Sequence, residues 1–296
     1  MKCLRTFPAG SSGGPDGLTA QHLRDLLSGA PDQVFVSALT DFVNILLTGE
    51  LPVSVREILF GGRLVALQKK DGGIRPIAVG YTLRRLAAKC ANAYVIKRRS
   101  DELKPIQVGV GVDGGAEAAV HATRRLLHHL PDDHVFVKLD FTNAFNSIRR
   151  DLILQSIAEK TPELYRFIYA SLACNSKLTF SGETVISAEG SQQGDPLGSL
   201  EFCEAIQSTL LSTISRITLG YIDDVNLEGK IDQVAKNVQS IIDSCEHTGL
   251  SLNEAKCEVT ANDVAIVNNY PVFRQFKKVH KSDLKLLGAP VMEGEA

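Results

Sequence analysis

The stretch that decides the fold is TLGYIDDVNL, residues 218–227. Apolar residues precede and follow two adjacent acids, Asp223 and Asp224. The pattern predicts a strand at Thr218–Tyr221, a tight turn that carries the acids, and a return strand at Val225–Leu227. Two carboxylates so close together repel, and their burial is costly unless a cation lies between them. Taken alone, the four residues from Tyr221 are better explained as an ordinary hairpin turn.

A third acid follows another apolar run. Val135–Leu139 is predicted to be a strand, and Asp140 comes directly after it. An acid at such a strand end can meet the hairpin acids across one sheet. Three carboxylates in that arrangement hold two metal ions about 3.5–4 Å apart, as in-line displacement at phosphorus requires. Such oxygen ligands suit Mg²⁺. The simpler alternative is that Asp140 caps the helix that follows it.

Residues 191–197, SQQGDPL, combine a glycine with a proline at a predicted helix start. The helix is expected over Pro196–Ser215, so backbone N–H groups are available at its N-terminus. Gln193 can hydrogen-bond the edge of a base or a sugar. By itself, the segment is more simply a loop that leads into a core helix.

Two strands are predicted at Arg63–Leu67 and Ile74–Val79, joined by a glycine-containing loop. The loop carries Lys69 and Lys70, and Arg75 lies at the start of the second strand. Lysine and arginine can grip a triphosphate, arginine in a bidentate manner. This hairpin is therefore a candidate nucleotide-binding element.

The remaining pattern alternates helices and strands irregularly. The strongest amphipathic helix is Leu83–Arg98, whose apolar stripe leaves Arg84, Arg85 and Lys89 to one side. Further helices are predicted near residues 19–27, 34–47, 116–130 and 232–247, and from Asp151 and Thr161. Further strands are predicted at residues 177–180, 183–188, 256–260 and 264–267. This order predicts a mixed α/β (α+β) protein.

Composition excludes several classes of protein. No apolar run approaches 18 residues, so no membrane span is expected. The first 14 residues lack the apolar core of a signal peptide. The six cysteines are scattered without a Cys-x-x-Cys pair, which argues against a zinc site or a disulfide framework. A reducing, intracellular location is expected.

The net charge of −2 hides a strongly basic segment. Between Arg63 and Arg99 there are ten basic residues and one acid, Asp71, a net of +9. A second basic stretch follows from Arg274 to Lys285. Clustered positive charge is what phosphate binding needs, although a charge run alone is more simply a solvated face.

In their order and spacing, these motifs resemble those of a reverse transcriptase of the non-LTR retrotransposon (LINE-type) family. The resemblance runs from about Gly13 to Val291 and rests on six segments: Arg75-Pro76-Ile77, Asp140–Phe145, Gln193–Leu197, Tyr221–Asp224, Leu252-Asn253 with Lys256, and Leu287-Gly288. It implies a right-hand polymerase fold with fingers and palm and with the thumb largely missing. The implied divisions are a lead and fingers extension at residues 1–50, fingers at 51–137, and a palm at 138–292 with a fingers insertion near 151–190.

The resemblance also implies a role for each matching residue. Asp140, Asp223 and Asp224 would hold two Mg²⁺ ions (or Mn²⁺), with the Phe141 carbonyl as a further oxygen and Lys256 as a catalytic acid. Lys69, Lys70, Arg75, Phe145, Gln193 and Gly194 would bind the incoming nucleotide. Arg84, Arg85, Lys89 and Tyr221 would contact nucleic acid. The expected partners are an RNA template, a DNA primer and dNTPs.

Several alternatives stand beside this reading. An RNA-dependent RNA polymerase shares the acids, but there the fifth residue after the first acid is usually acidic, whereas here it is Phe145. A non-enzymatic remnant that binds nucleic acid stays open. Residues 109–114, GVGVDG, match the dinucleotide fingerprint by letters but follow only a short apolar run, so such a site is disfavoured. His128, His129 and His134 are expected at a solvated helix end rather than on a metal.

Overall fold

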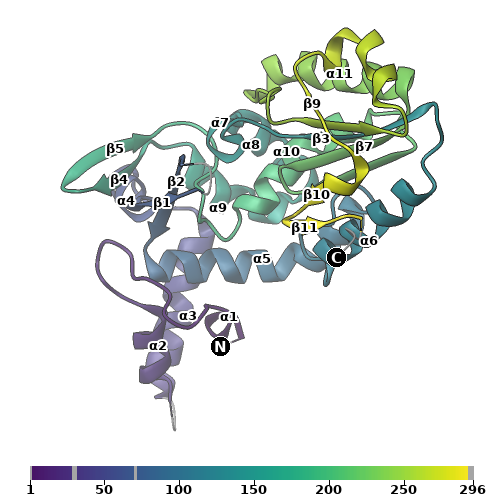
Figure 1. The fold of residues 1–296 in the computed structure, drawn as a ribbon. Helices are drawn as coiled ribbons and strands as arrows, with labels where there is room; N and C mark the ends of the chain where they lie inside the picture. The colour runs from purple at the N-terminus through teal and green to yellow at the C-terminus, as the bar shows by residue number, and fades with distance from the viewer. Residues whose placement is uncertain (1, 29–31, 70–71, 293–296) are drawn as a thin grey trace. The chain divides into compact units, whose positions relative to one another are not determined.

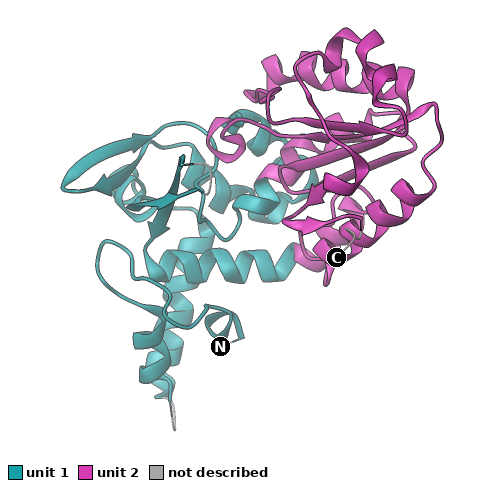
Figure 2. Ribbon diagram, in the orientation of Figure 1, with its two compact units in different colours: residues 1–95, 148–201 teal, residues 96–147, 202–296 magenta. Residues whose placement is uncertain are grey.

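The computed structural model describes residues 2–28, 32–69 and 72–292. The chain divides into two compact units (Figure 2). Unit 1 combines residues 1–95 with 148–201, and unit 2 combines residues 96–147 with 202–296. Residues 96–137 thus group with Asp140, not with the hairpin that carries Arg75. Residues 148–201 return to the unit formed by the first part of the chain.

Unit 1 is built around a four-stranded sheet in the order β2-β1-β4-β5 (Figure 1). The strands are β1 Gly62–Gln68, β2 Ile74–Gly80, β4 Ser176–Phe180 and β5 Glu183–Ser187. Its helices are α1 Lys2–Arg5, α2 Ala20–Leu26, α3 Gln33–Thr48, α4 Val53–Leu59, α8 Arg150–Lys160 and α9 Pro162–Leu172. The predicted hairpins are confirmed. Thr19 is the N-cap of α2, and Pro162 is the first residue of α9.

Unit 2 is built around a five-stranded sheet in the order β6-β7-β3-β8-β9. The strands are β3 His134–Leu139, β6 Ile217–Tyr221, β7 Asp224–Lys230, β8 Glu258–Ala261 and β9 Lys277–Lys278. Its helices are α6 Gly115–His128, α7 Ala144–Ser147, α10 Gly198–Leu211 and α11 Ile231–Thr248, with short 3₁₀ turns η1 Val264–Asn269, η2 Pro271–Phe273 and η3 Lys281–Asp283. The small β10 Lys285–Leu286 and β11 Ala289–Pro290 pair with each other. Helices α5, Thr82–Leu103, and α10 each contain a boundary between the units.

Strand β3 lies at the centre of the unit 2 sheet. It pairs with β7 on one side and β8 on the other, which is why its apolar run is buried almost throughout. In Figure 1, α11 covers one face of the sheet and α6 lies on the other. A cluster of buried side chains fills the α6 face, with Leu127, Phe136 and Leu286 among its members. Gly249 ends α11 in the left-handed conformation.

Two element predictions were wrong or inexact. The strand predicted at 264–267 is the 3₁₀ turn η1, because Asp263 accepts a hydrogen bond from the Ala265 N–H and starts a helical turn. The helix predicted from Pro196 begins at Gly198. Within the described residues, no single helix is long and apolar enough to cross a membrane; the bent pair α3 and α4, at 109°, reaches the required length and composition only together.

Candidate active site

Strand register brings the three predicted acids to one edge of the unit 2 sheet. Leu139 pairs with Val225 in the antiparallel ladder of β3 and β7. Continuing that register by one residue places Asp140 opposite Asp224. Asp223 occupies the two-residue turn between β6 and β7, where Tyr221 is the partner of Asp224. The sequence thus predicted correctly that a strand end and a hairpin turn converge.

The electrostatics of Asp224 reflect this crowding. Burial raises the pKa of Asp224 to about 6, and repulsion from Asp223 and Asp140 adds to the rise. Lys138 opposes the shift. A hard divalent cation would relieve this repulsion with oxygen ligands. Among the described residues, however, no three His, Cys, Asp or Glu side chains form a finished ligand cluster.

The segment after Asp140 is held by the predicted Leu252-Asn253 motif. The Asn253 N–H donates to the Asp140 carbonyl at 2.8 Å, and Phe141 and Leu252 form an antiparallel bridge. The Asp140 N–H also donates to Cys257 Sγ at 3.3 Å. Two motifs more than a hundred residues apart are therefore one local structure. Lys256 lies exposed in the turn that follows.

Phe145, which is predicted to bind the incoming nucleotide, lies on α7. Its ring stacks on Phe202 of α10, with centroids 5.3 Å apart and planes at 25°. Phe202 is fully buried, whereas Phe145 is half-buried. One face of Phe145 is thus fixed by the core while part of the side chain stays accessible.

The turn between β6 and β7 has strained backbone. Ile222, the first of its two central residues, has a φ of +62°. Two-residue hairpin turns require positive φ there and favour glycine, and an L residue in the left-handed region costs roughly 1–2 kcal/mol. A β-branched residue in this conformation is a true outlier, and such outliers gather at functional sites.

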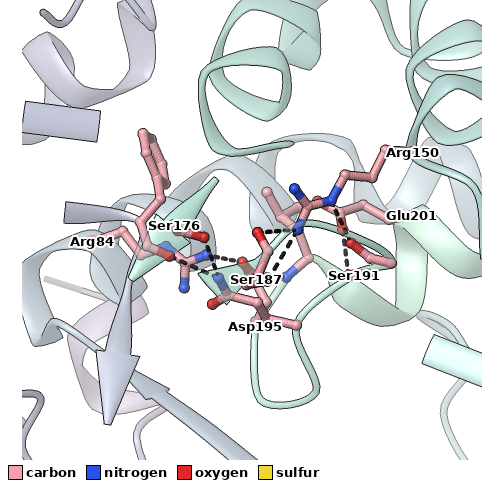
Figure 3. Close-up of polar contacts among 11 residues, drawn as sticks. Arg84, Arg150, Ser176, Ser187, Ser191, Asp195 and Glu201 are labelled. Carbon is pink, nitrogen blue, oxygen red and sulfur yellow. Dashed lines mark hydrogen bonds and ion pairs between the residues drawn. The ribbon is translucent and has the colours of Figure 1, made fainter. Parts of the chain in front are cut away.

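In unit 1, the loop 191–196 is fixed by buried charge (Figure 3). Asp195 forms an ion pair with Arg84, and its other oxygen accepts from the Leu197 N–H at 3.0 Å. Ser191 Oγ donates to the buried Glu201 carboxyl at 2.6 Å. Burial raises the pKa of Glu201 to about 7, repulsion from Asp195 adds to it, and the Ser191 hydrogen bond opposes it.

Arg150, which sequence reasoning missed, holds the segment before this loop. Its guanidinium donates to the carbonyl oxygens of Leu172, Cys174, Ser187, Glu189 and Gly190 and to Ser187 Oγ, at 2.9–3.4 Å. An arginine with five N–H donors suits such a cluster of carbonyls. No local pattern marks Arg150, because its partners lie 22 to 40 residues away.

The backbone conformation and a close contact explain why residue 194 is a glycine. Its φ is +116°, and a Cβ there would lie 2.6 Å from the Ala78 carbonyl oxygen. The Gln193 carbonyl accepts from the Ala78 N–H at 2.8 Å, so this part of the loop lies against β2. The Gln193 side chain is half-buried.

The predicted cations separate into exposed and internal groups. Arg75 is exposed and Lys69 is half-buried, while Lys70 lies outside the described residues. Arg84 is only 2% exposed and paired with Asp195, so its guanidinium makes an internal contact in this structure, and its role in contacting nucleic acid stays a prediction. The helical stripe placed Arg84 on a solvent face, but the loop 191–196 covers that face.

Arg85 and Lys89 contact the N-terminal segment. Both lie over the Phe7 ring, at 5.4 and 4.9 Å from its centroid. Arg85 also donates to the Ser12 carbonyl at 2.5 Å. Their role in nucleic-acid binding stays a prediction, as does that of the half-buried Tyr221.

Gly109 and His134, from the motifs that the sequence disfavoured as ligand sites, make contacts within unit 2. A Cβ on Gly109 would lie 2.8 Å from Ile222 Cγ1, so this glycine permits close contact with the β6–β7 turn. His134 is buried in β3 with its Nδ1 2.8 Å from Glu228, which corrects the expectation of a solvated helix end.

The fold is similar to that of telomerase from Candida tropicalis. The apo structure matches with a TM-score of 0.51 and 12% identity, over 79% of this chain and 50% of that chain. An apo structure truncated from the C-terminal domain matches with a TM-score of 0.49 and 15% identity, over 67% of this chain and 49% of that chain. The chain thus spans about half the length of these telomerase chains. No curated protein matches it.

The fold is therefore that of a reverse transcriptase-type polymerase. Residues 67–291 match the family described as reverse transcriptase (RNA-dependent DNA polymerase), which is more than half of the 296 residues. The chain belongs to the reverse transcriptase family.

Proposed function

We propose that this chain is an RNA-directed DNA polymerase that adds dNTPs to a primer 3′-hydroxyl by two-metal nucleotidyl transfer. The observation that carries the proposal is the register of β3 and β7, which sets Asp140 opposite Asp224 beside the turn that bears Asp223. We further propose a retrotransposon (LINE-type) origin and an intracellular location, which rest on the order of the motifs and the scattered cysteines.

The donor atoms of these residues suit a divalent metal by their chemistry. Three carboxylates at one sheet edge, with the carbonyl of Phe141 next to Asp140, supply only oxygen, as Mg²⁺ prefers. Two bound ions would lower the pKa of the primer hydroxyl and neutralise charge on the departing pyrophosphate. The chain's own contribution is positioning: β3, β7 and the turn fix where each carboxylate lies, which is most of what phosphoryl transfer asks of a protein.

Other residues receive roles in binding the nucleotide and the template. Phe145, supported by Phe202, would exclude a ribose 2′-hydroxyl. Lys69, Lys70 and Arg75 would hold the triphosphate, and Gln193 with Gly194 would position the template base and nucleotide. Lys256, exposed beside Asn253, would protonate pyrophosphate.

The proposal is tested by Asp223→Ala in a primer-extension assay with an RNA template and Mg²⁺. Loss of one metal carboxylate removes several kcal/mol of transition-state stabilisation, so incorporation should fall about 10³-fold or more. Asp243→Ala, at an exposed acid of α11, is the matched control and should keep full activity. Full activity of a folded Asp223→Ala protein would overturn the metal site.

The second candidate is a remnant that binds nucleic acid without copying it. Such a remnant would need only cations such as the exposed Arg75 to bind nucleic acid, and would not need the three acids. A wild-type chain that binds primer–template but extends no primer with either Mg²⁺ or Mn²⁺ would establish this alternative.

A further inference from the structure

We propose that Gln107 is the positioning residue for the turn that carries Asp223, a role that rests on the function proposed above. The Gln107 side chain is fully buried. Its Nε2 donates to the Ile222 carbonyl at 3.1 Å, and its Oε1 accepts from the Ile222 N–H at 3.0 Å. One side-chain amide therefore satisfies both backbone groups of the residue with strained backbone.

The backbone on either side of Gln107 also lies against this hairpin. The Gly220 N–H donates to the Ile106 carbonyl at 2.7 Å, and the Val108 N–H donates to the Gly220 carbonyl at 2.9 Å. Gln107 and Gly220 form a parallel bridge. Residues 106–108 thus act as a short additional strand on the outer edge of β6, and they bring the Gln107 amide to the turn.

Two glycines make room for this contact. A Cβ on Gly220 would lie 2.6 Å from Gln107 Nε2, and a Cβ on Gly109 would lie 2.9 Å from the Ile222 nitrogen. Contacts so short would displace the amide or the turn. The sequence therefore provides small residues on both sides of the contact.

The chemistry of glutamine fits this position. Ile222 does not favour a positive φ, so the turn needs a partner that holds it there. A neutral amide fixes both backbone groups without changing the charge beside Asp223 and Asp224. Groups that orient metal ligands without touching the metal typically change metal affinity 10–100-fold when they are lost. Gln107 acts on the acids in this way, through the backbone of Ile222.

The test compares Gln107→Met with Gln207→Met. Methionine keeps the approximate volume and removes both hydrogen bonds. Gln207 is a matched control because its amide also donates to a backbone carbonyl, that of Leu103, at 3.3 Å in the same unit. In Gln107→Met, amide hydrogen exchange at Ile222 should speed up about tenfold or more, and Mn²⁺ affinity by titration calorimetry should fall about 10–100-fold. Gln207→Met should change neither.

A second variant keeps the test decisive if Gln107→Met folds poorly. Gly220→Ala pushes the Gln107 amide away without removing it and should give the same fast exchange. Adding Gly220→Ala to a Gln107→Ala protein should then lower its stability little further, because the amide with which the new Cβ would clash is gone. Such non-additivity is expected of residues in contact. Unchanged exchange at Ile222 in both single variants overturns the role of Gln107. Failure of the wild type to bind Mn²⁺, or equal binding by Asp223→Ala, overturns the proposed function instead.

Discussion

The turn that carries Asp223 and the loop 191–196 are both irregular backbone held in fixed positions, but by different chemistry. The turn is held by the neutral amide of Gln107. The loop is held by the Arg84–Asp195 ion pair and the buried Glu201 carboxyl. A turn next to acids that are proposed to bind cations gains from a partner without charge. The loop has no such constraint. A buried ion pair and a buried titratable acid hold it, which makes it sensitive to charge removal and to pH.

The largest effect is expected when one member of the buried ion pair is neutralised. Asp195→Asn keeps an acceptor for the Leu197 N–H but leaves the Arg84 guanidinium buried without its counter-charge. Breaking a buried pair in this way typically costs roughly 3–5 kcal/mol. Urea denaturation monitored by circular dichroism measures the loss.

The control for this comparison is Asp151→Asn, in the solvent-exposed pair with Arg149. Exposed pairs contribute little, so its stability should stay near that of the wild type. Equal stability of Asp195→Asn and wild type would mean that buried charge does not fix the loop.

The next effect concerns pH. Burial raises the pKa of Glu201 to about 7 from an ordinary 4.5, so the folded state favours the neutral acid. Its contribution to stability is complete below about pH 4.5 and is lost as the pH rises through about 7. The full loss is on the order of a few kcal/mol, since a change of one in pKa corresponds to about 1.4 kcal/mol. Glu201→Gln mimics the neutral acid and should flatten the fall in stability between pH 4.5 and 8.

The measurement is the difference in unfolding free energy between wild type and Glu201→Gln at several pH values. Glu246→Gln, at an exposed acid of α11, should parallel the wild type throughout. A constant difference across this range would show that Glu201 does not titrate within it.

The two regions also differ in how far the sequence predicted them. The sheet edge was predictable because an apolar run followed by an acid, and an Asp-Asp pair between strands, are local patterns. The contacts that hold the turn and the loop in place were not predictable. Arg84 and Asp195 are 111 residues apart, and Gln107 and Ile222 are 115 apart. Helical periodicity assigned Arg84 to a solvent face, since a stripe of apolar residues cannot reveal which polar face a distant loop will cover. Glu201 did leave a signal, because it and Glu204 are two acids in a predicted helix that is otherwise mostly apolar.

A smaller effect is expected at Phe145. Like the turn that carries Asp223, this residue is held by an uncharged contact, in its case the Phe202 ring. Phe145→Val should admit ribonucleotides, because the stacked ring no longer fills the space of a 2′-hydroxyl. Overpacking a formed pocket costs typically 1–3 kcal/mol, or about ten- to a hundred-fold in selectivity. The measurement is the ratio of dNTP to rNTP incorporation efficiency. Tyr169→Val, which removes a comparable stacked ring from α9, should leave the ratio unchanged. A lower melting temperature with an unchanged ratio would make Phe145 a core residue only.

The smallest effect distinguishes the exposed cations from those used internally. Arg75 is exposed at the start of β2, whereas Arg84 is buried in its ion pair. Each phosphate contact contributes about 0.7–0.9 to the slope of log affinity against log salt. Arg75→Gln should therefore reduce that slope for primer–template by about this amount and leave the melting temperature unchanged. Arg84→Gln should leave the slope unchanged and lower the melting temperature, since it removes an internal charge and no phosphate contact. Binding measured from 50 to 200 mM salt, with melting temperature alongside, separates the two. A reduced slope in folded Arg84→Gln would show that the pair opens to bind nucleic acid, and the loop 191–196 would then be held by charge only in the free protein.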